Sequence, residues 1–222
     1  MPLSHYSNNF HDLLNMARLR HVDSGQTIAT TDDIDGLYCV KEGFVKRFNI
    51  KNDGSLSVQG VYGPGDCFGI SAVSALLMRS HVYKGMETYY YEAISDAVIY
   101  DVNISILREM LSKHQELYKD LFVIQSWHGL SDIWRMENQA LQNANKRVAH
   151  IICFYMERYG ILTTKGWRFK VPFIQQDLAD ILDLSRETVS IAINELKKEK
   201  LIKGSRKIIV SNLAALKEYS YQ

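Results

Sequence analysis

The residues from Ser185 to Lys198 carry side chains whose types and spacing suit hydrogen bonding to nucleobases. An arginine such as Arg186 can donate two hydrogen bonds to guanine O6 and N7, and Glu187 can accept one from cytosine N4. Further along, Ser190 is small enough to let a helix sit deep in a groove. The predicted base-contacting residues are Arg186, Glu187, Ser190, Ile191 and Asn194.

Cations and hydroxyl groups around this segment suit contacts with a phosphate backbone. Residues 203–207 read KGSRK, which is a basic turn, and the β-prone residues 208–210 follow it. We expect this turn to form a wing whose cations meet phosphates, which position a protein on a duplex without reading its sequence. The predicted phosphate-contacting residues are Ser185, Thr188, Lys197, Lys198, Lys203, Arg206 and Lys207.

Two short helices would have to position these side chains. Leu178, Ile181 and Leu182 form one apolar stripe, and residues 183–184 interrupt it. Ser185 is a good N-cap for a second helix, whose apolar positions 189, 193 and 196 recur at helical spacing. Two helices joined by a turn of three to four residues form a helix-turn-helix. The alternative is an amphipathic helix pair with solvated charges.

Helices also precede this unit. From residue 104 to about 143 there is no proline, and apolar residues recur at three- and four-residue spacing. One helix of that length would be about 60 Å long and would pack on a copy of itself, and a break near Gly129 is the alternative. A further helix is predicted over 146–159 with Gly160 as its stop, and a short strand over 167–171.

The region from about residue 27 to 102 is rich in strand and turn signals. Apolar and β-branched runs lie at 37–40, 44–50, 56–58, 89–93 and 97–102. Turn residues separate them at Glu42-Gly43, Asn52-Asp53-Gly54 and 63–66. Many short strands at such spacing indicate a barrel, sandwich or jelly roll.

Composition sets the frame for these elements. A chain of 222 residues with 46% hydrophobic and 23% charged residues is typical of a globular protein with two domains. Residues 1–145 carry a net charge of −5, whereas residues 146–222 carry 14 Lys and Arg against 8 Asp and Glu, a net charge of +6. A basic C-terminal segment beside an acidic one favours nucleic acid as the partner of the C-terminal part.

The sequence lacks the signatures of several other classes of protein. No apolar run is long enough to span a membrane, no secretion signal is visible, and the cytoplasm is the expected location. The cysteines at 39, 67 and 153 form no CxxC pair, so we expect buried, unpaired thiols and no metal site or disulfide framework. No Gly-rich phosphate loop, GxSxG or HExxH occurs, and we predict no catalytic residues. A cupin-like metal enzyme is the distant alternative.

The segment from Leu178 to Ser190, LADILDLSRETVS, closely resembles the helix-turn-helix signature of the Crp/Fnr family, and the turns at 42–43, 52–54 and 63–69 are similar to turns of its β-roll. The resemblance implies an α+β fold with a cyclic-nucleotide-binding-like β-roll (a double-stranded jelly roll) at 1–103. A long dimerisation helix and hinge would follow at 104–145, and a winged helix-turn-helix DNA-binding domain at 146–222. Members are typically homodimers that bind palindromic promoter sites, and RNA polymerase is an expected partner of this protein if it is an activator.

Three positions depart from the family pattern. Ile191 stands where relatives commonly place a base-contacting arginine, and Asp183 stands where the turn usually has glycine, although Asp tolerates a left-handed conformation. Family members that bind cyclic nucleotides carry Phe-Gly-Glu, and the glutamate takes the ribose hydroxyl, whereas here Phe68-Gly69 is followed by Ile70. Arg79-Ser80 retains the arginine that would hold the cyclic phosphate.

We therefore predict no cofactor and do not expect cyclic AMP to be the effector, which the sequence leaves unidentified. Three alternatives remain open: an apolar effector bound in the β-roll, a cyclic-nucleotide-responsive regulator, and a regulator that needs no effector. The aromatic residues of the β-roll are equally consistent with a role only in its core and in the dimer interface. The candidate effector-pocket residues are Phe68, Gly69, Ile70, Arg79, Ser80, Tyr89, Tyr91 and Trp127.

Overall fold

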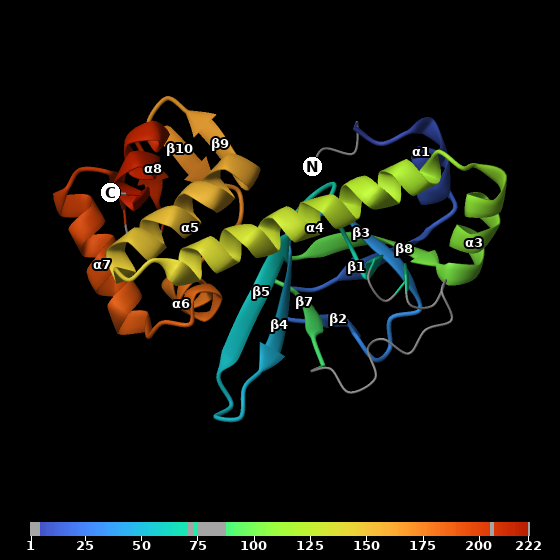
Figure 1. Cartoon of the computed structure of the whole chain (residues 1–222), viewed down its shortest axis with the longest axis horizontal. Helices are drawn as coiled ribbons and strands as arrows, with labels where there is room; N and C mark the ends of the chain where they lie inside the picture. Colours follow the sequence, from blue (N-terminus) through green and yellow to red (C-terminus); the bar gives the residue numbers. More distant parts are fainter. Residues whose placement is uncertain (1–4, 71–72, 75–87, 205–206, 222) are drawn as a thin grey trace. The chain divides into compact units, whose positions relative to one another are not determined.

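A computed structural model describes residues 5–70, 73–74, 88–204 and 207–221. The chain divides into two compact units, which Figure 1 shows coloured along the sequence. The first unit comprises residues 1–49 and 59–130, and the second comprises residues 50–58 and 131–222. The tip of one hairpin in the N-terminal half therefore belongs to the C-terminal unit.

Among the described residues of the N-terminal half, eight strands form two four-stranded sheets. One sheet has the order β1-β8-β3-β6, from β1 (Arg18–Val22), β8 (Ala97–Asn103), β3 (Gly36–Glu42) and β6 (Cys67–Phe68). The other has the order β2-β7-β4-β5, from β2 (Thr27–Thr30), β7 (Tyr90–Ala93), β4 (Val45–Ile50) and β5 (Leu56–Tyr62). Successive strands along the chain alternate between the two sheets, except that β4 and β5 lie in the same sheet. This is the connectivity of a jelly roll, and the predicted fold class is confirmed.

The turn signals lie between the strands as predicted. Gly43 follows β3 with a φ of 80°, and a Cβ at this position would lie 2.3 Å from the carbonyl oxygen of Asp96, so only glycine fits. At the turn between β5 and β6, Asp66 accepts a hydrogen bond from the backbone N–H of Gly63 at 2.8 Å. Strand β1 lies before the region in which strands were expected, and β2 lies at its start, where no individual strand was predicted.

The helical region after the jelly roll consists of two helices. Helix α3 spans Ile104–Lys113 and helix α4 spans Leu117–Ala140, so the chain breaks at 114–116. Both sequence-based alternatives were wrong in this respect, because α3 and α4 are separate helices (Figure 1). Gly129 lies inside α4, which has no break there. The backbone of His114 is extended, which lets the apolar faces of both helices reach the same core.

That core joins the helices to the sheet. Leu107 of α3 and Leu117 and Ile124 of α4 are almost fully buried in one cluster with Phe10 and Leu13 of α1 (Asn8–Asn15). Helix α1 is also held by α4, since the carboxylate of Asp120 accepts hydrogen bonds from the Ser7 backbone N–H at 3.1 Å and hydroxyl at 2.6 Å. The N-terminal half of α4 is therefore an integral part of the first unit.

The second unit begins with the end of α4 and α5 (Ala144–Tyr159), and β9 (Gly160–Thr163) and β10 (Gly166–Phe169) follow. It continues with α6 (Gln175–Leu182), α7 (Arg186–Lys198), β11 (Ile202–Lys203), β12 (Ile209–Val210) and α8 (Leu213–Tyr221). The four strands form a sheet of order β11-β12-β10-β9. The predicted helix 146–159 and the strand near 167 are confirmed, and Gly160 is the C-cap of α5.

The cysteines do not all behave as expected. Cys39 of β3 and Cys67 of β6 oppose one another in register and form a disulfide, which corrects the expectation of unpaired thiols. The sequence conceals this pair because 28 residues separate the two cysteines and only strand pairing brings them together. Cys153 of α5 is free and buried, and burial raises the pKa of its thiol to about 12.

This disulfide yields a prediction about stability. Closing a loop of 28 residues restricts the unfolded chain, so reduction should lower the free energy of unfolding by about 2–4 kcal/mol. Urea unfolding with and without reductant measures this effect, and a Cys39→Ala, Cys67→Ala double variant should not respond to the reductant. Thiol titration of the unreduced protein in denaturant should find one thiol per chain, and three would contradict the disulfide.

Candidate nucleic-acid interface

Helix α6 is the first helix of the predicted pair, and its ends are well defined. The carboxylate of Asp177 accepts a hydrogen bond at 2.7 Å from the backbone N–H of Ile174, the N-cap residue, and so stabilises the N-terminus of α6. Leu178, Ala179 and Leu182 are buried. Their burial holds one face of α6 against the body of the unit.

The turn after α6 depends on one residue with a left-handed backbone. Asp183 has φ 52° and ψ 47°, and the N–H of Leu184 donates to the carbonyl oxygen of Ala179 at 3.0 Å. The prediction that the turn survives with Asp in place of glycine is therefore confirmed. The guanidinium of Arg147 on α5 also donates a hydrogen bond to the carbonyl oxygen of Leu182, the residue before Asp183.

Ser185 starts α7 as predicted. Its hydroxyl oxygen accepts a hydrogen bond from the backbone N–H of Thr188 at 3.0 Å and lies 2.9 Å from the Thr188 hydroxyl. Four side chains on one face of α7 have no solvent exposure at all, namely Val189, Ala192, Ile193 and Leu196. The helix is thereby fixed in rotation as well as in position.

The opposite face of α7 presents the predicted base-contacting residues. Arg186, Glu187, Ile191 and Asn194 are exposed, and Ser190 is half-buried between them. The side chain of Ile191 is 62% exposed. The structure therefore brings all five residues to the solvent-facing side of one helix.

Cations surround this face. Lys197 donates to the Asn194 side-chain oxygen at 3.3 Å, and Lys198 forms an exposed ion pair with Glu195 at 2.6 Å. Beyond α7, Lys203 pairs in register with Ile209 across β11 and β12, and Lys207 is exposed on the connecting turn. The predicted wing is therefore present as two paired strands, while Arg206 lies outside the described residues.

Two further cations were not foreseen from the sequence. Arg168 and Lys170 are exposed. Together with Lys207 and Phe173 they line a cleft of about 300 Å³. The signal available was the alternation of basic and apolar residues in 167–171, which places every second side chain on the same face of a strand. These residues extend the basic surface beside the wing.

The candidate effector-pocket residues fall into two groups. Phe68, Ile70 and Tyr91 are buried, and the rings of Phe68 and Tyr91 stack at 4.6 Å between centroids. Gly69 is buried beside them. By contrast, Tyr89 is half-buried under the guanidinium of Arg47, and Trp127 is 43% exposed on α4, so neither joins this cluster. Arg79 and Ser80 lie outside the described residues.

The described residues contain neither a cluster of potential metal ligands nor a helix able to span a membrane. Among these residues, no group of three or more His, Cys, Asp or Glu side chains is placed to hold a metal ion. Likewise, none of the helices in the described ranges combines the length and apolarity needed to cross a bilayer.

Comparison with known proteins agrees with this architecture. Residues 19–114 match the family model of the cyclic nucleotide-binding domain, and residues 146–219 match that of the Crp-like helix-turn-helix domain. The anaerobic regulatory protein of Aggregatibacter actinomycetemcomitans is 23% identical over 190 residues, which cover 85% of this chain and 70% of that protein. The fumarate and nitrate reduction regulatory protein of Escherichia coli is 21% identical over 193 residues, which cover 86% and 74%.

Solved structures share the fold. FixK2 from Bradyrhizobium japonicum aligns with a TM-score of 0.73 at 20% identity, over 91% of this chain and 96% of that chain. CooA from Carboxydothermus hydrogenoformans aligns with a TM-score of 0.73 at 16% identity, over 94% and 90%.

The cap of α7 can be tested by substitution. Ser185→Ala removes the acceptor for the Thr188 N–H and should lower the free energy of unfolding of the second unit by about 1 kcal/mol. Thermal or urea unfolding measures the change. Ser190→Ala, on the solvent-facing side of the same helix, is the matched control and should change stability by less than about 0.5 kcal/mol. Equal losses in the two variants would argue against the cap.

Proposed function

The chain belongs to the Crp/Fnr family of DNA-binding transcription regulators, and from this premise we propose that it reads palindromic promoter sites as a homodimer. The observation that carries the proposal is the solvent-facing side of α7, where Arg186, Glu187, Ile191 and Asn194 lie together. A helix of this kind enters the major groove, and twofold symmetry places half-sites about 34 Å apart.

Base recognition is assigned to the first turns of α7. Arg186 would donate to guanine and Glu187 would accept from cytosine, because these pairings match the donors and acceptors in the major groove. Ile191 cannot donate a hydrogen bond, so at its position we expect contact with a thymine methyl group. The preferred site would accordingly differ from that of relatives with arginine there.

Phosphate contacts are assigned to the cations around α7 and the wing. Lys203 and Lys207 are exposed at the wing, and Arg168 and Lys170 add charge beside Lys207. Each such contact releases counterions from the duplex, so affinity should fall steeply with salt. The hydroxyl groups of Ser185 and Thr188 bond to one another, and because this bond uses only one of their two O–H hydrogens, the other can donate to a phosphate.

Dimerisation is assigned to α4. The helix buries Leu117, Leu121 and Ile124 against the sheet, yet it exposes an apolar series on its other sides. The members of this series are Tyr118 (56% exposed), Phe122 (72%), Val123 (36%), Trp127 (43%), Leu130 (51%), Ile133 (52%) and Met136 (65%). So many exposed apolar residues on one helix mark an interaction site, and a second copy of α4 is the occupant that a twofold DNA site requires.

The effector is proposed to be something other than cyclic AMP, or absent. Ile70 is 3% exposed and apolar at the position where the family's cyclic-nucleotide binders carry the ribose-binding glutamate. A ribose hydroxyl facing it would lose its partner, at a cost of about 1–3 kcal/mol. The location is proposed to be the cytoplasm, where promoter DNA and RNA polymerase are present, and polymerase would be a partner if the protein activates.

The experiment that tests this function is selection from a randomised DNA pool with the purified, ligand-free protein. Enrichment of a palindrome with half-sites about one helical turn apart would support a dimeric reader that needs no effector. If no sequence is enriched, the selection should be repeated with cyclic AMP. A palindrome that appears only then would favour the cyclic-nucleotide-responsive alternative, and none in either case would contradict a regulator that needs no effector.

Substitutions should separate base from phosphate contacts. Arg186→Ala should weaken binding to the selected site by about 1–3 kcal/mol and relax the preference at one base pair. Lys207→Ala should weaken binding to all sequences evenly and reduce the salt slope by about one unit. Fluorescence anisotropy on a panel of single-base variants at several salt concentrations distinguishes the two, and the reverse pattern would refute the assignments.

The dimer interface gives a separate prediction. Phe122→Glu introduces a charge into the most exposed part of the apolar series and should convert dimers to monomers, as measured by sedimentation. Gln125→Glu, an exposed position outside the series, is the control and should leave the dimer intact. A wild-type protein that sediments as a monomer at micromolar concentration would overturn this assignment.

A further inference from the structure

The tip of the β4–β5 hairpin belongs to the same compact unit as the helix-turn-helix. At the tip, the Lys51 N–H donates to the Ser55 carbonyl oxygen at 2.9 Å, and the Gly54 N–H donates to the Lys51 carbonyl oxygen at 2.9 Å. Asp53 accepts from the N–H and the hydroxyl of Ser55 at 2.9 and 2.6 Å, which lowers the pKa of its carboxyl. The tip is thus internally braced and presents Lys51 in a defined position.

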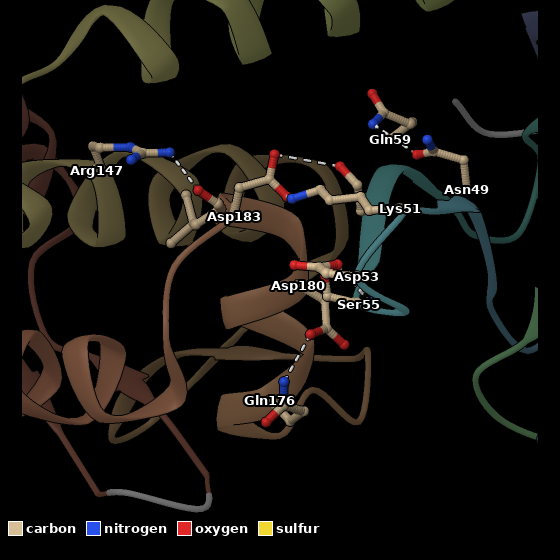
Figure 2. Close-up of polar contacts among 11 residues, drawn as sticks. Asn49, Lys51, Asp53, Ser55, Gln59, Arg147, Gln176, Asp180 and Asp183 are labelled. Carbon is tan, nitrogen blue, oxygen red and sulfur yellow. Dashed lines mark hydrogen bonds and ion pairs between the residues drawn. The ribbon is translucent and has the colours of Figure 1, made fainter. Parts of the chain in front are cut away.

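This braced tip holds the turn of the helix-turn-helix through Asp183, as Figure 2 shows. The ammonium of Lys51 lies 2.7 Å from one carboxylate oxygen of Asp183. The hydroxyl of Ser57, which is 5% exposed, donates to the other carboxylate oxygen at 3.3 Å. Both oxygens of a single turn residue are therefore occupied by groups from the hairpin, 126 and 132 residues away in sequence.

A second contact approaches the same turn from α5. The guanidinium of Arg147 donates to the carbonyl oxygen of Leu182 and, at 3.4 Å, to the side-chain oxygen of Asn138 at the end of α4. The Asn138 amide donates in return to the Arg147 carbonyl oxygen at 2.8 Å. Residues 182–183 are consequently held from two directions, by the hairpin and by the junction of α4 and α5.

The contact between Lys51 and Asp183 lies close to the start of the recognition helix. Asp183 lies two residues before Ser185, the N-cap of the recognition helix α7, and its backbone is in the left-handed region. On the other side, β4 and β5 continue from the tip into the sheet with β7 and β2. A displacement of this hairpin within its sheet would therefore act on Lys51 and Ser57, and through them on the start of α7.

We propose that the turn of the helix-turn-helix is a docking site for the hairpin tip, and that Lys51 and Asp183 are positioning residues that couple the jelly roll to the recognition helix. Asp183 does not need to touch DNA for this role. The pairing also neutralises a carboxylate next to the base-contacting residues, where an unpaired negative charge would repel phosphates. The docked state is accordingly the one that favours DNA binding, and this part of the inference rests on the proposed function.

Two nearly isosteric variants test the coupling in the full-length protein without DNA. Lys51→Met keeps the apolar stem and removes the charge, and Asp183→Asn removes the charge while retaining a residue that tolerates the left-handed backbone. Hydrogen exchange is followed at the hairpin tip, residues 51–56, and at the turn, residues 182–188. Since exposed ion pairs contribute modestly, each variant should speed exchange about two- to five-fold in both segments.

The double variant and the controls decide the result. If the two charges act on one another, the Lys51→Met, Asp183→Asn protein should exchange no faster than the faster single variant, and the effect should shrink at high salt. Lys113→Met, which breaks the exposed Lys113–Glu109 pair on α3, should leave both segments unchanged. Additive effects, or a Lys51 variant that accelerates only the hairpin, would overturn the docking.

Binding to the selected DNA site supplies the functional readout. Both single variants and the double variant should bind about two- to five-fold more weakly than the wild type, with the base preferences unchanged. Tighter binding would overturn the proposed direction of the coupling. A wild-type protein that selects no DNA would contradict the proposed regulator that needs no effector but not the docking, because the exchange measurements need no DNA.

Discussion

Complete burial of one face of α7 is the constraint on which the rest of the second unit depends. Val189, Ala192, Ile193 and Leu196 have no exposure, and together their side chains determine the rotation of the helix about its axis. The side that carries Arg186, Glu187 and Asn194 must then face solvent. Recognition chemistry on a helix is useful only when its rotation is settled, because a shift of one residue turns a side chain by about 100°.

The start of α7 is settled by shorter-range contacts. Asp183 reverses the chain in a left-handed conformation, and Ser185 caps the helix two residues later. Neither contact is strong by itself, since a cap contributes about 1 kcal/mol. The hairpin and Arg147 add contacts at the same turn, so the stiffness of the turn depends on residues far away in sequence. Such an arrangement lets a change in the jelly roll alter the recognition helix without altering any residue that meets DNA.

Helix α4 carries apolar residues on more than one of its sides. Its first half buries Leu117, Leu121 and Ile124 in the core of the first unit, and its remaining sides expose Phe122 and Trp127. In the proposed dimer α4 packs on its own sheet and on a second copy, so it needs apolar residues on more than one side. The same packing requires the break at 114–116, which allows α3 to reach the sheet separately.

The sequence by itself determined the elements whose signals are local. The stripe in α6, the cap at Ser185, the periodic face of α7 and the basic turn after it lie within about thirty residues, and their propensities agree with one another. The turns of the jelly roll and the family resemblance could also be predicted from the sequence, because they too depend on short local motifs. Only the tertiary structure decided the Cys39–Cys67 disulfide, the break before Leu117 and the contact of Lys51 with Asp183. Each of these depends on strand pairing or packing between segments distant along the chain, and local propensity carries no record of which distant segments will meet.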